Sequence, residues 1–402
     1  MTLNDATKRV AHFAPQGAIL SVFLLTFALT GPLSHWPEFA VLVLVFFLFY
    51  PALPPLVPLL IVVVFALLGI ISPAPVPAGL FVLGSLLFVL LTASFTRISK
   101  GDLADLVILA GVVHALFVVL GKDAAGRGYG LLDNANIAGS FLAMVLLIAL
   151  ARSKWPHAAA IAIGLLDTAS VGALLGAVAG LAVLAGQDAR LLSFIRQHRR
   201  WVLILGGCLF AALAIFLVAA QQSWWPDRLL IWQVALQQFT QHPITGGGLN
   251  FYRQLWQDSL PLVTLSDNLQ FFLGPLPQWP PAPHAHNVWL NVAAEAGVIG
   301  LAALAILVYW LFKALKGSLA LPALTALVVH NLVDVTVWHP AIVSTVAAIV
   351  ALGLPEQYMP IRRLPGLVSY SISHTFTASR LRREVSRRQR AEAWAAPRWP
   401  LT

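Results

Sequence analysis

Apolar runs close to the length of a membrane-spanning helix recur along almost the whole chain. About 20 apolar residues cross the hydrocarbon core of a bilayer, and the sequence predicts about twelve such spans. We place them at 17–33, 37–50, 54–72, 77–95, 103–121, 136–151, 156–167, 169–186, 202–220, 288–312, 319–338 and 340–354. Only 10% of the residues are charged, against about 25% in soluble proteins. The predicted fold is an all-α polytopic membrane protein.

The Lys and Arg residues predict the orientation, because cytoplasmic loops of membrane proteins carry the excess of positive charge. With the N-terminus inside, 21 of the 25 basic residues fall on the cytoplasmic side. The outer side keeps Lys122, Arg127, Arg228 and Arg253. Both termini are expected in the cytoplasm. The net charge of +9 is then a topology signal, and no nucleic-acid partner is expected.

Two segments are not expected to span the membrane. The transmembrane domain, 1–354, includes a long extracytoplasmic loop at 221–287, with an amphipathic helix expected at 227–241 before Pro243. A loop of this length is usually functional. The basic cytoplasmic tail, 355–402, is either a disordered topology anchor or a helix on anionic lipid.

Arg127 is the first outward arginine and lies in a glycine-rich turn, Gly126 to Gly130. Glycines let backbone amides approach a ligand, and a guanidinium offers a planar fork for phosphate. The structural alternative is a solvated turn, with Asn134 or Asn136 capping the next helix.

Arg228 is expected in the first turn of the loop helix, where it opposes the helix dipole unless an anion is near. Bound phosphate would relieve that conflict; an ion pair with Asp227 is the alternative. Arg253 fits a loop-surface or headgroup contact.

His284 and His286 directly precede the span at 288–312. An imidazole at a membrane interface can accept a proton from a hydroxyl near neutral pH. An interfacial or helix-capping histidine is the structural alternative. A zinc or copper site with Asp258 or Asp267 is a third possibility, although no spacing matches a known ligand signature.

His330 and Asp334 are four residues apart in the span at 319–338, so they are expected on one helical face, with His339 at its outer end. Asp334 is a candidate to orient an imidazole such as His286, as a carboxylate does in a catalytic triad. The alternative is a hydrogen bond between packed helices. Glu295 is ambiguous in the same way.

The string His286-Asn287, nine residues and then Gly297 resembles a signature of the O-antigen ligase family. The wider superfamily contains O-antigen polymerases and protein O-oligosaccharyltransferases. Three further strings follow the family's usual order: Arg127 to Asn136, Arg228 to Trp232, and His242 to Gly248. Family members often have Ser-Arg-Gly where this chain has Ser170-Val171-Gly172, a departure that leaves Arg127 as the second phosphate ligand.

The resemblance implies a GT-C-like glycosyltransferase of the bacterial inner membrane, with its active site facing the periplasm. The donor would be a polysaccharide on undecaprenyl pyrophosphate and the acceptor a sugar hydroxyl of lipid A–core. The reaction would invert the anomeric carbon without metal or other cofactor. His286 would be the general base, with Asp334 as the second catalytic residue. Substrate binding would fall to Arg127, Asn136, Arg228, Arg253, His284 and His339.

A lipid-linked saccharide transporter or flippase is the alternative from a different class. Ionisable residues should then line a path through the membrane, whereas mid-span positions hold only His114, Glu295 and His330. No internal repeat is evident, which weakens a transporter built from inverted repeats.

Overall fold

The computed structural model describes residues 54–132, 134–187, 224–260 and 282–355, with isolated positions at 41–44 and 193–200. The expected spans at 17–33 and 202–220, almost all of 37–50, and the tail after Pro355 lie outside these residues. The described part contains helices and, besides them, an isolated bridge between Lys122 and Gly128.

Each expected span within the described residues corresponds to one helix, and the expected loop helix is also present. The bounds are α3 Leu56–Ile70, α4 Pro75–Phe95, α5 Lys100–Leu120, α6 Ala135–Ala151, α7 Trp155–Asp167, α8 Val171–Gln187, α11 Trp224–Gln241, α12 Tyr252–Ser259, α14 Val288–Ala314, α15 Ala320–His330 and α16 Pro340–Gly353.

The described helices suit a bilayer in both length and surface. Helices α4, α5 and α14 are long and apolar enough to cross a membrane, and α3, α6, α8, α15 and α16 are shorter apolar helices. Their outward faces are apolar too: on α3, Leu67 and Ile70 are 60% and 78% exposed. Such a surface is costly in water and favourable in lipid. The chain is a multi-pass membrane protein.

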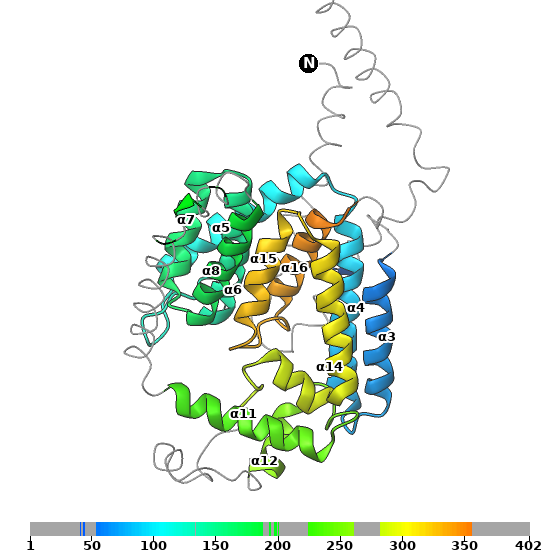
Figure 1. Cartoon of the computed structure of the whole chain (residues 1–402). Coiled ribbons are helices and arrows are strands. Elements are labelled where there is room, and N and C mark those ends of the chain that lie inside the picture. The colour runs from blue at the N-terminus through cyan, green and yellow to red at the C-terminus, as the bar shows by residue number, and fades with distance from the viewer. Residues whose placement is uncertain are drawn as a thin grey trace, which may run out of the picture. The chain divides into compact units, whose positions relative to one another are not determined.

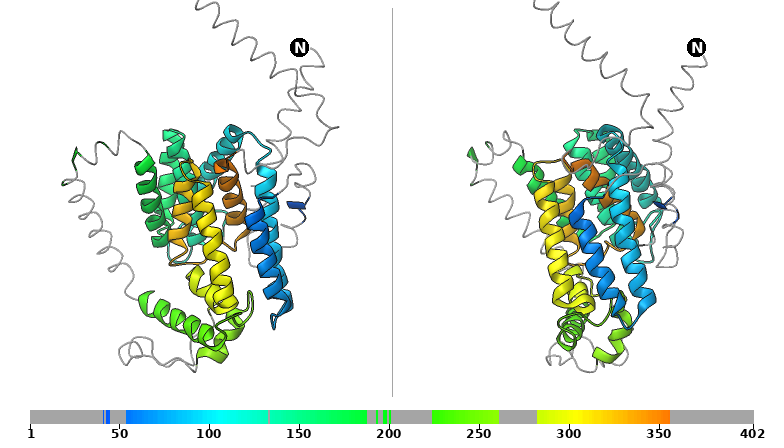
Figure 2. Two further views of the ribbon diagram at one scale, coloured as in Figure 1. Left: turned by 45° about the vertical axis from the view of Figure 1, so that its right-hand side comes forward. Right: turned by 90° about the vertical axis from the view of Figure 1, so that its right-hand side faces the viewer.

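The helices pack as one bundle with the loop helices across one end (Figures 1 and 2). Helices α5 to α8 pack together, and α6 and α8 pack against α15. Helix α3 packs on α4 and α14, and α16 contacts α4, α5, α6 and α15. Helices α8 and α15 approach closely, since a Cβ on Gly176 would lie 2.3 Å from the carbonyl oxygen of Ala326. Small residues permit such contact between membrane helices. Helix α11 contacts α12 and α14.

Helix α15 ends at His330, so the prediction of one helix from 319 to 338 is wrong. Asp334 lies in the non-helical connection to α16 and shares no helical face with His330. The Asn331 side chain explains the early end: its oxygen accepts the amide of Thr336 at 2.9 Å, and its nitrogen donates to the carbonyl of Leu327 at 2.9 Å. These bonds satisfy the backbone of the connection without a helix.

Candidate functional site

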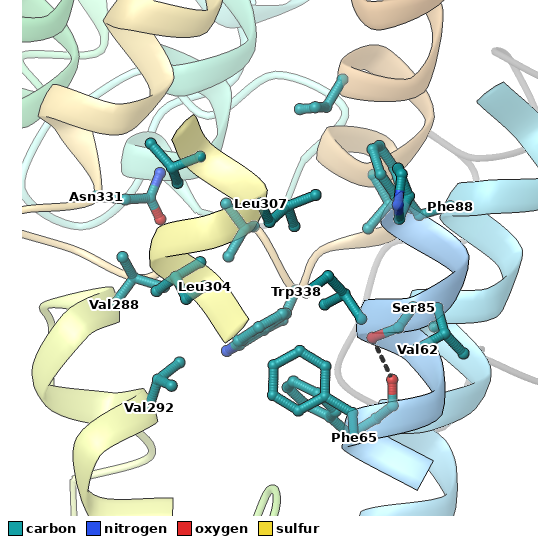
Figure 3. Close-up of a pocket in the computed structure, with 18 of the residues that line it drawn as sticks. Val62, Phe65, Ser85, Phe88, Val288, Val292, Leu304, Leu307, Asn331 and Trp338 are labelled. Atoms are coloured by element: carbon teal, nitrogen blue, oxygen red, sulfur yellow. Dashed lines mark hydrogen bonds between the residues drawn. The ribbon is translucent and has the colours of Figure 1, made fainter. Parts of the chain in front are cut away.

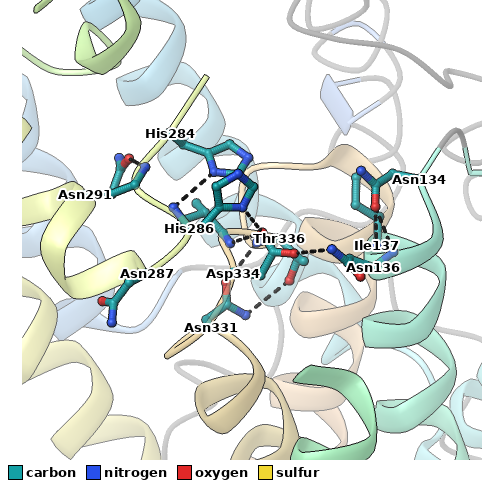
Figure 4. A network of polar contacts seen from close by, with 12 residues as sticks. Asn134, Asn136, Ile137, His284, His286, Asn287, Asn291, Asn331, Asp334 and Thr336 are labelled. Carbon is teal, nitrogen blue, oxygen red and sulfur yellow. Dashed lines mark hydrogen bonds and ion pairs between the residues drawn. The ribbon is translucent and has the colours of Figure 1, made fainter. Parts of the chain in front are cut away.

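His286 and Asp334 form the centre of a polar network (Figure 4). Nδ1 of His286 lies 3.0 Å from Oδ1 of Asp334. A carboxylate at Nδ1 fixes the proton there in the neutral ring, so Nε2 is the atom that accepts a proton from a substrate. The His286 side chain is 21% exposed and that of Asp334 only 8%. The predicted base is therefore reachable, while its partner is buried.

The same carboxylate links the histidine to Arg127. Oδ2 of Asp334 accepts Nδ2 of Asn136 at 2.7 Å, and Oδ1 of Asn136 accepts Nη2 of Arg127 at 2.7 Å. Nε of Arg127 donates to the carbonyl of Thr168 at 3.2 Å. Asn134 caps α6 through the amides of its first turn, so the capping alternative holds for Asn134, while Asn136 bridges the network.

The loop before α14 holds His286 in place through its neighbour. Oδ1 of Asn287 accepts the amides of Trp289 and Leu290, at 2.9 and 3.1 Å. Its Nδ2 donates to the carbonyl of Leu332 at 2.8 Å, in the α15–α16 connection. Asn287 is thus the helix cap, and the suggestion that His286 serves as a cap is wrong. One asparagine therefore links the loop that contains His286 to the loop that contains Asp334.

Arg228 is buried, and it lies beyond the first turn of its helix, where the helix dipole would act on it most strongly. Helix α11 begins at Trp224, so Arg228 follows its first turn and the prediction of a first-turn position is wrong. The side chain is only 6% exposed. Burial lowers the pKa of Arg228, while the charges of Asp334 and Asp227 raise it. An anion next to it would offset the cost of burying this charge.

The two predicted arginines meet at one small cavity of about 60 Å³, here called the polar cavity. Its walls come from the α5–α6 loop, α6, the α7–α8 turn, α8, α11, the end of α15 and the α15–α16 connection. The lining residues are Arg127, Asn136, Ala169, Val171, Gly172, Arg228, His330, Val333 and Asp334. The cavity therefore brings Arg127, Arg228 and the carboxylate of Asp334 together.

His284 adjoins His286 and Asp334. Its ring packs edge-on to that of His286 with centroids 4.2 Å apart, and burial lowers its pKa against the raising effect of Asp334. His284, His286 and Asp334 offer ligand atoms within 4.8 Å of one another, so a metal ion bound here would take these three. Asp258 is exposed on α12, and Asp267 lies outside the described residues.

Two other predicted binding residues lie elsewhere. Nδ1 of His339 accepts the amide of Ala341 at 3.2 Å and so caps α16. Arg253 is exposed on α12. Neither residue lines the polar cavity.

Helix α14 is interrupted where the loop segment 243–248 meets it. Two glycine amides of this segment bond carbonyls that α14 would otherwise use, at 2.8 and 3.1 Å. In exchange, the amides of Val298 and Ile299 donate to loop carbonyls at 2.9 and 3.3 Å. Gly297 permits the exchange with φ 61°, a conformation that glycine adopts without steric cost. The segment 243–248 is therefore hydrogen-bonded to α14, the helix that follows His286 in the chain.

Glu295 connects α14 to α11, the helix that contains Arg228, through the segment that follows α11. Its side chain is buried, and its two oxygens accept the amides of Asn250 and Tyr252 at 3.0 and 3.1 Å. The hydroxyl of Tyr252 donates to the carbonyl of Ile231 on α11 at 2.9 Å. Ile231 is three residues after Arg228, so these bonds hold that arginine relative to α14.

We expect Glu295→Gln to lower the free energy of unfolding by about 1–3 kcal/mol, the usual cost of an unpaired buried group. A glutamine has one acceptor oxygen, and its NH₂ group would face a second backbone N–H. Thermal unfolding of the purified variant measures the loss. Tyr252→Phe, which removes only the bond to Ile231, should cost less, and wild-type stability of Glu295→Gln would contradict the assignment.

An apolar cavity of about 190 Å³ lies among α3, α4, α14, α15 and α16 (Figure 3). Trp338 stands at its centre, with its ring 4.7 Å from that of Phe81. Among the residues that line this cavity, Val288 comes two residues after His286, and Asn331 comes three residues before Asp334. Protein interiors seldom leave voids larger than a water molecule, and an apolar cavity of this size suits a hydrocarbon ligand.

Comparison with known proteins identifies the family of the chain. The family model described as O-antigen ligase matches residues 86–305, more than half of the chain. The chain belongs to the O-antigen ligase family. No curated protein matches it. Family membership places the chain among membrane glycosyltransferases of the O-antigen ligase and polymerase type. The matched residues include Arg127, Arg228 and His286 but end before Asp334.

Several residues that shape this candidate site were not among the predicted site residues. Asn287 was visible inside the His-Asn string, and its position before a helix is a capping signal. Asn331, which ends α15, had a weaker signal as a polar residue within an apolar run. No sequence pattern pointed to Tyr252, because its partners are 43 and 21 residues away.

Proposed function

We propose that this protein is an O-antigen ligase. It transfers a polysaccharide from undecaprenyl pyrophosphate to a sugar hydroxyl of lipid A–core, with inversion and without a metal. The observation that carries the proposal is the hydrogen-bonded series from Arg127 through Asn136 and Asp334 to His286. It joins the proposed phosphate ligand to the proposed general base within one hydrogen-bonded network.

In the proposed reaction, the acceptor hydroxyl oxygen attacks the anomeric carbon of the donor sugar. Nε2 of His286 takes the hydroxyl proton, and Asp334 stabilises the imidazolium that forms. The bond from the anomeric carbon to the pyrophosphate oxygen breaks, and its electrons leave with the lipid pyrophosphate. A single displacement inverts the carbon, and the activated donor supplies the energy.

Arg127 and Arg228 are proposed to bind the departing pyrophosphate. Negative charge grows on this group in the transition state, and preorganised donors stabilise charge that develops there. Both guanidinium groups line the polar cavity together with Asp334. The base and the charge-stabilising groups are therefore adjacent, as one displacement requires.

The apolar cavity and the charge distribution support a lipid substrate at the periplasmic face. A hydrocarbon chain in the apolar cavity would place the attached head group near His286.

The outward position of Arg127 and Arg228 follows from the excess of basic residues on the other side. We propose twelve spans in a GT-C-like arrangement in the inner membrane, with both termini, including the 355–402 tail, in the cytoplasm and 221–287 in the periplasm.

The deciding experiment is a transfer assay with purified protein and a lipid-linked polysaccharide. Lipid A–core, a peptide and a second saccharide are offered separately as acceptors, with and without a chelator. We expect a product on lipid A–core alone, at the same rate in chelator. A product on the second saccharide or on the peptide would indicate a polymerase or a protein O-oligosaccharyltransferase instead. Vesicles that translocate the donor without forming a glycosidic product would indicate a flippase.

A further inference from the structure

His330 is the buried residue of the polar cavity that the proposed reaction does not use. Its side chain is 2% exposed, and neither ring nitrogen has a hydrogen-bond partner among the described residues. A neutral imidazole carries one N–H donor and one acceptor. Leaving both unpaired in the interior costs free energy, and an unsatisfied buried group in a native structure calls for an explanation such as a bound ion or a catalytic role.

The first turn of α8 forms the wall next to His330. Ala169, Val171 and Gly172 line the polar cavity at this point. The first amides of a helix have no carbonyl to bond within the helix, and together they favour an anion. Ser170 precedes α8, yet its buried hydroxyl has no hydrogen-bond partner in the described part of the chain, so it does not cap these amides.

Gly172 lets the imidazole approach this turn directly. A Cβ at position 172 would lie 2.5 Å from Cδ2 and 3.0 Å from Nε2 of His330. The Nε2 edge of the ring therefore faces the start of α8, and any side chain at 172 would displace it. The unpaired imidazole and the helix N-terminus meet at one point of the cavity.

The charged side chains that line the polar cavity near His330 favour an anion as the ligand. Arg127 and Arg228 line the same cavity, and its one lining carboxylate is already engaged. Oδ1 of Asp334 pairs with His286, and Oδ2 accepts from Asn136. Two arginines against one carboxylate give this lining a net positive charge, which suits the oxygens of a phosphate group.

We propose that His330 and the first turn of α8 form a further phosphate-binding subsite, in which the imidazole N–H donates to a pyrophosphate oxygen. The proposal rests on the proposed function, because the polar cavity is there assigned to the donor pyrophosphate. It adds a neutral donor and helix amides to the two arginines. His330 would contact the leaving group and so contribute to donor affinity and to its departure.

The test is thermal unfolding of the full chain in nanodiscs, titrated with inorganic pyrophosphate. Ligand binding to the folded state raises the melting temperature. We expect His330→Phe and Gly172→Ala to raise the Kd for pyrophosphate roughly 10- to 100-fold, the effect of losing a hydrogen bond to a charged group. Without pyrophosphate, His330→Phe should unfold at the wild-type temperature or above, because it removes unpaired polar atoms. His330→Gln, which keeps an N–H donor, should bind more tightly than His330→Phe.

The matched control is His114→Phe, a buried histidine of α5 that lines neither cavity; its Kd should equal that of the wild type. A second titration compares nanodiscs containing undecaprenyl pyrophosphate with nanodiscs containing only phosphatidylglycerol, and stabilisation by the former alone identifies the donor phosphate. Wild-type affinity in His330→Phe, alongside lost binding in Arg228→Ala, would overturn the subsite and leave the proposed function intact. A wild-type protein stabilised by neither pyrophosphate probe would overturn the phosphate assignment of the whole cavity.

Discussion

Replacing His286 with alanine is expected to slow polysaccharide transfer by about 10²- to 10⁴-fold, the usual contribution of a general base. The side chain is partly exposed and its ring is fixed by Asp334, so its loss removes the proton acceptor and little packing. The rate is measured with purified protein. In a ligase-deficient host, the same variant should leave lipid A–core without polysaccharide.

Asp334→Asn should slow transfer nearly as much as His286→Ala. The asparagine amide can donate to Nδ1, which would leave the ring proton on Nε2 and remove its lone pair. Because the two side chains act as a unit, the double variant should be little slower than either single one.

His242→Ala serves as the control, since His242 is exposed in the turn after α11. It should retain the wild-type rate, and all variants should keep a cooperative thermal transition. Wild-type lipopolysaccharide ladders from cells with His286→Ala would contradict the assignment of the base.

The positions of the helices were largely predictable because their determinants are local. The end of α11 at Gln241 follows from Pro243 and the glycines after it, which cannot continue a helix. The break between α7 and α8 follows from the polar residues around Thr168 in an apolar stretch. Apolar periodicity and helix-breaking residues act over a few positions, so they can be read directly from the chain.

The early end of α15 and the break in α14 depend on tertiary contacts. Asn331 reaches five residues ahead to Thr336, within a stretch apolar enough to continue as a helix. The exchange of hydrogen bonds at Gly297 requires the segment 243–248, about 50 residues earlier in the chain. Neither the bond between Asn331 and Thr336 nor the exchange at Gly297 can be predicted from local helix propensity. The same residues are equally compatible with an uninterrupted helix.

Residues of the candidate site were predictable from the sequence, but the hydrogen bonds that join them were not. The His-Asn string and the scarce outward arginines identified His286, Arg127 and Arg228 as candidates. From the sequence, Asn136 was a candidate helix cap or a substrate-binding residue, since the same amide serves either role. Only the fold shows that it joins Arg127 to Asp334.

Arg228→Ala is expected to lower the transfer rate by about 10²- to 10³-fold, the usual effect of losing one preorganised donor to a developing negative charge. Arg228→Lys should recover only part of this loss, because an ammonium keeps the charge without the planar fork that matches phosphate. The effect should fall mainly on kcat, since the charge on the leaving pyrophosphate grows towards the transition state. Steady-state rates over a range of donor concentrations separate kcat from KM.

Arg127→Ala should behave differently from Arg228→Ala, because Arg127 also holds Asn136 and through it Asp334. Its removal should weaken the orientation of His286 as well as phosphate binding, so that Arg127→Ala and His286→Ala are not additive, as expected for residues in one network. Arg152→Ala, an exposed arginine outside both cavities, should transfer at the wild-type rate. If Arg228→Ala kept its kcat and raised only the KM for the donor, Arg228 would bind the donor equally in the ground and transition states, and the stabilisation of the leaving group would have to come from Arg127 and His330.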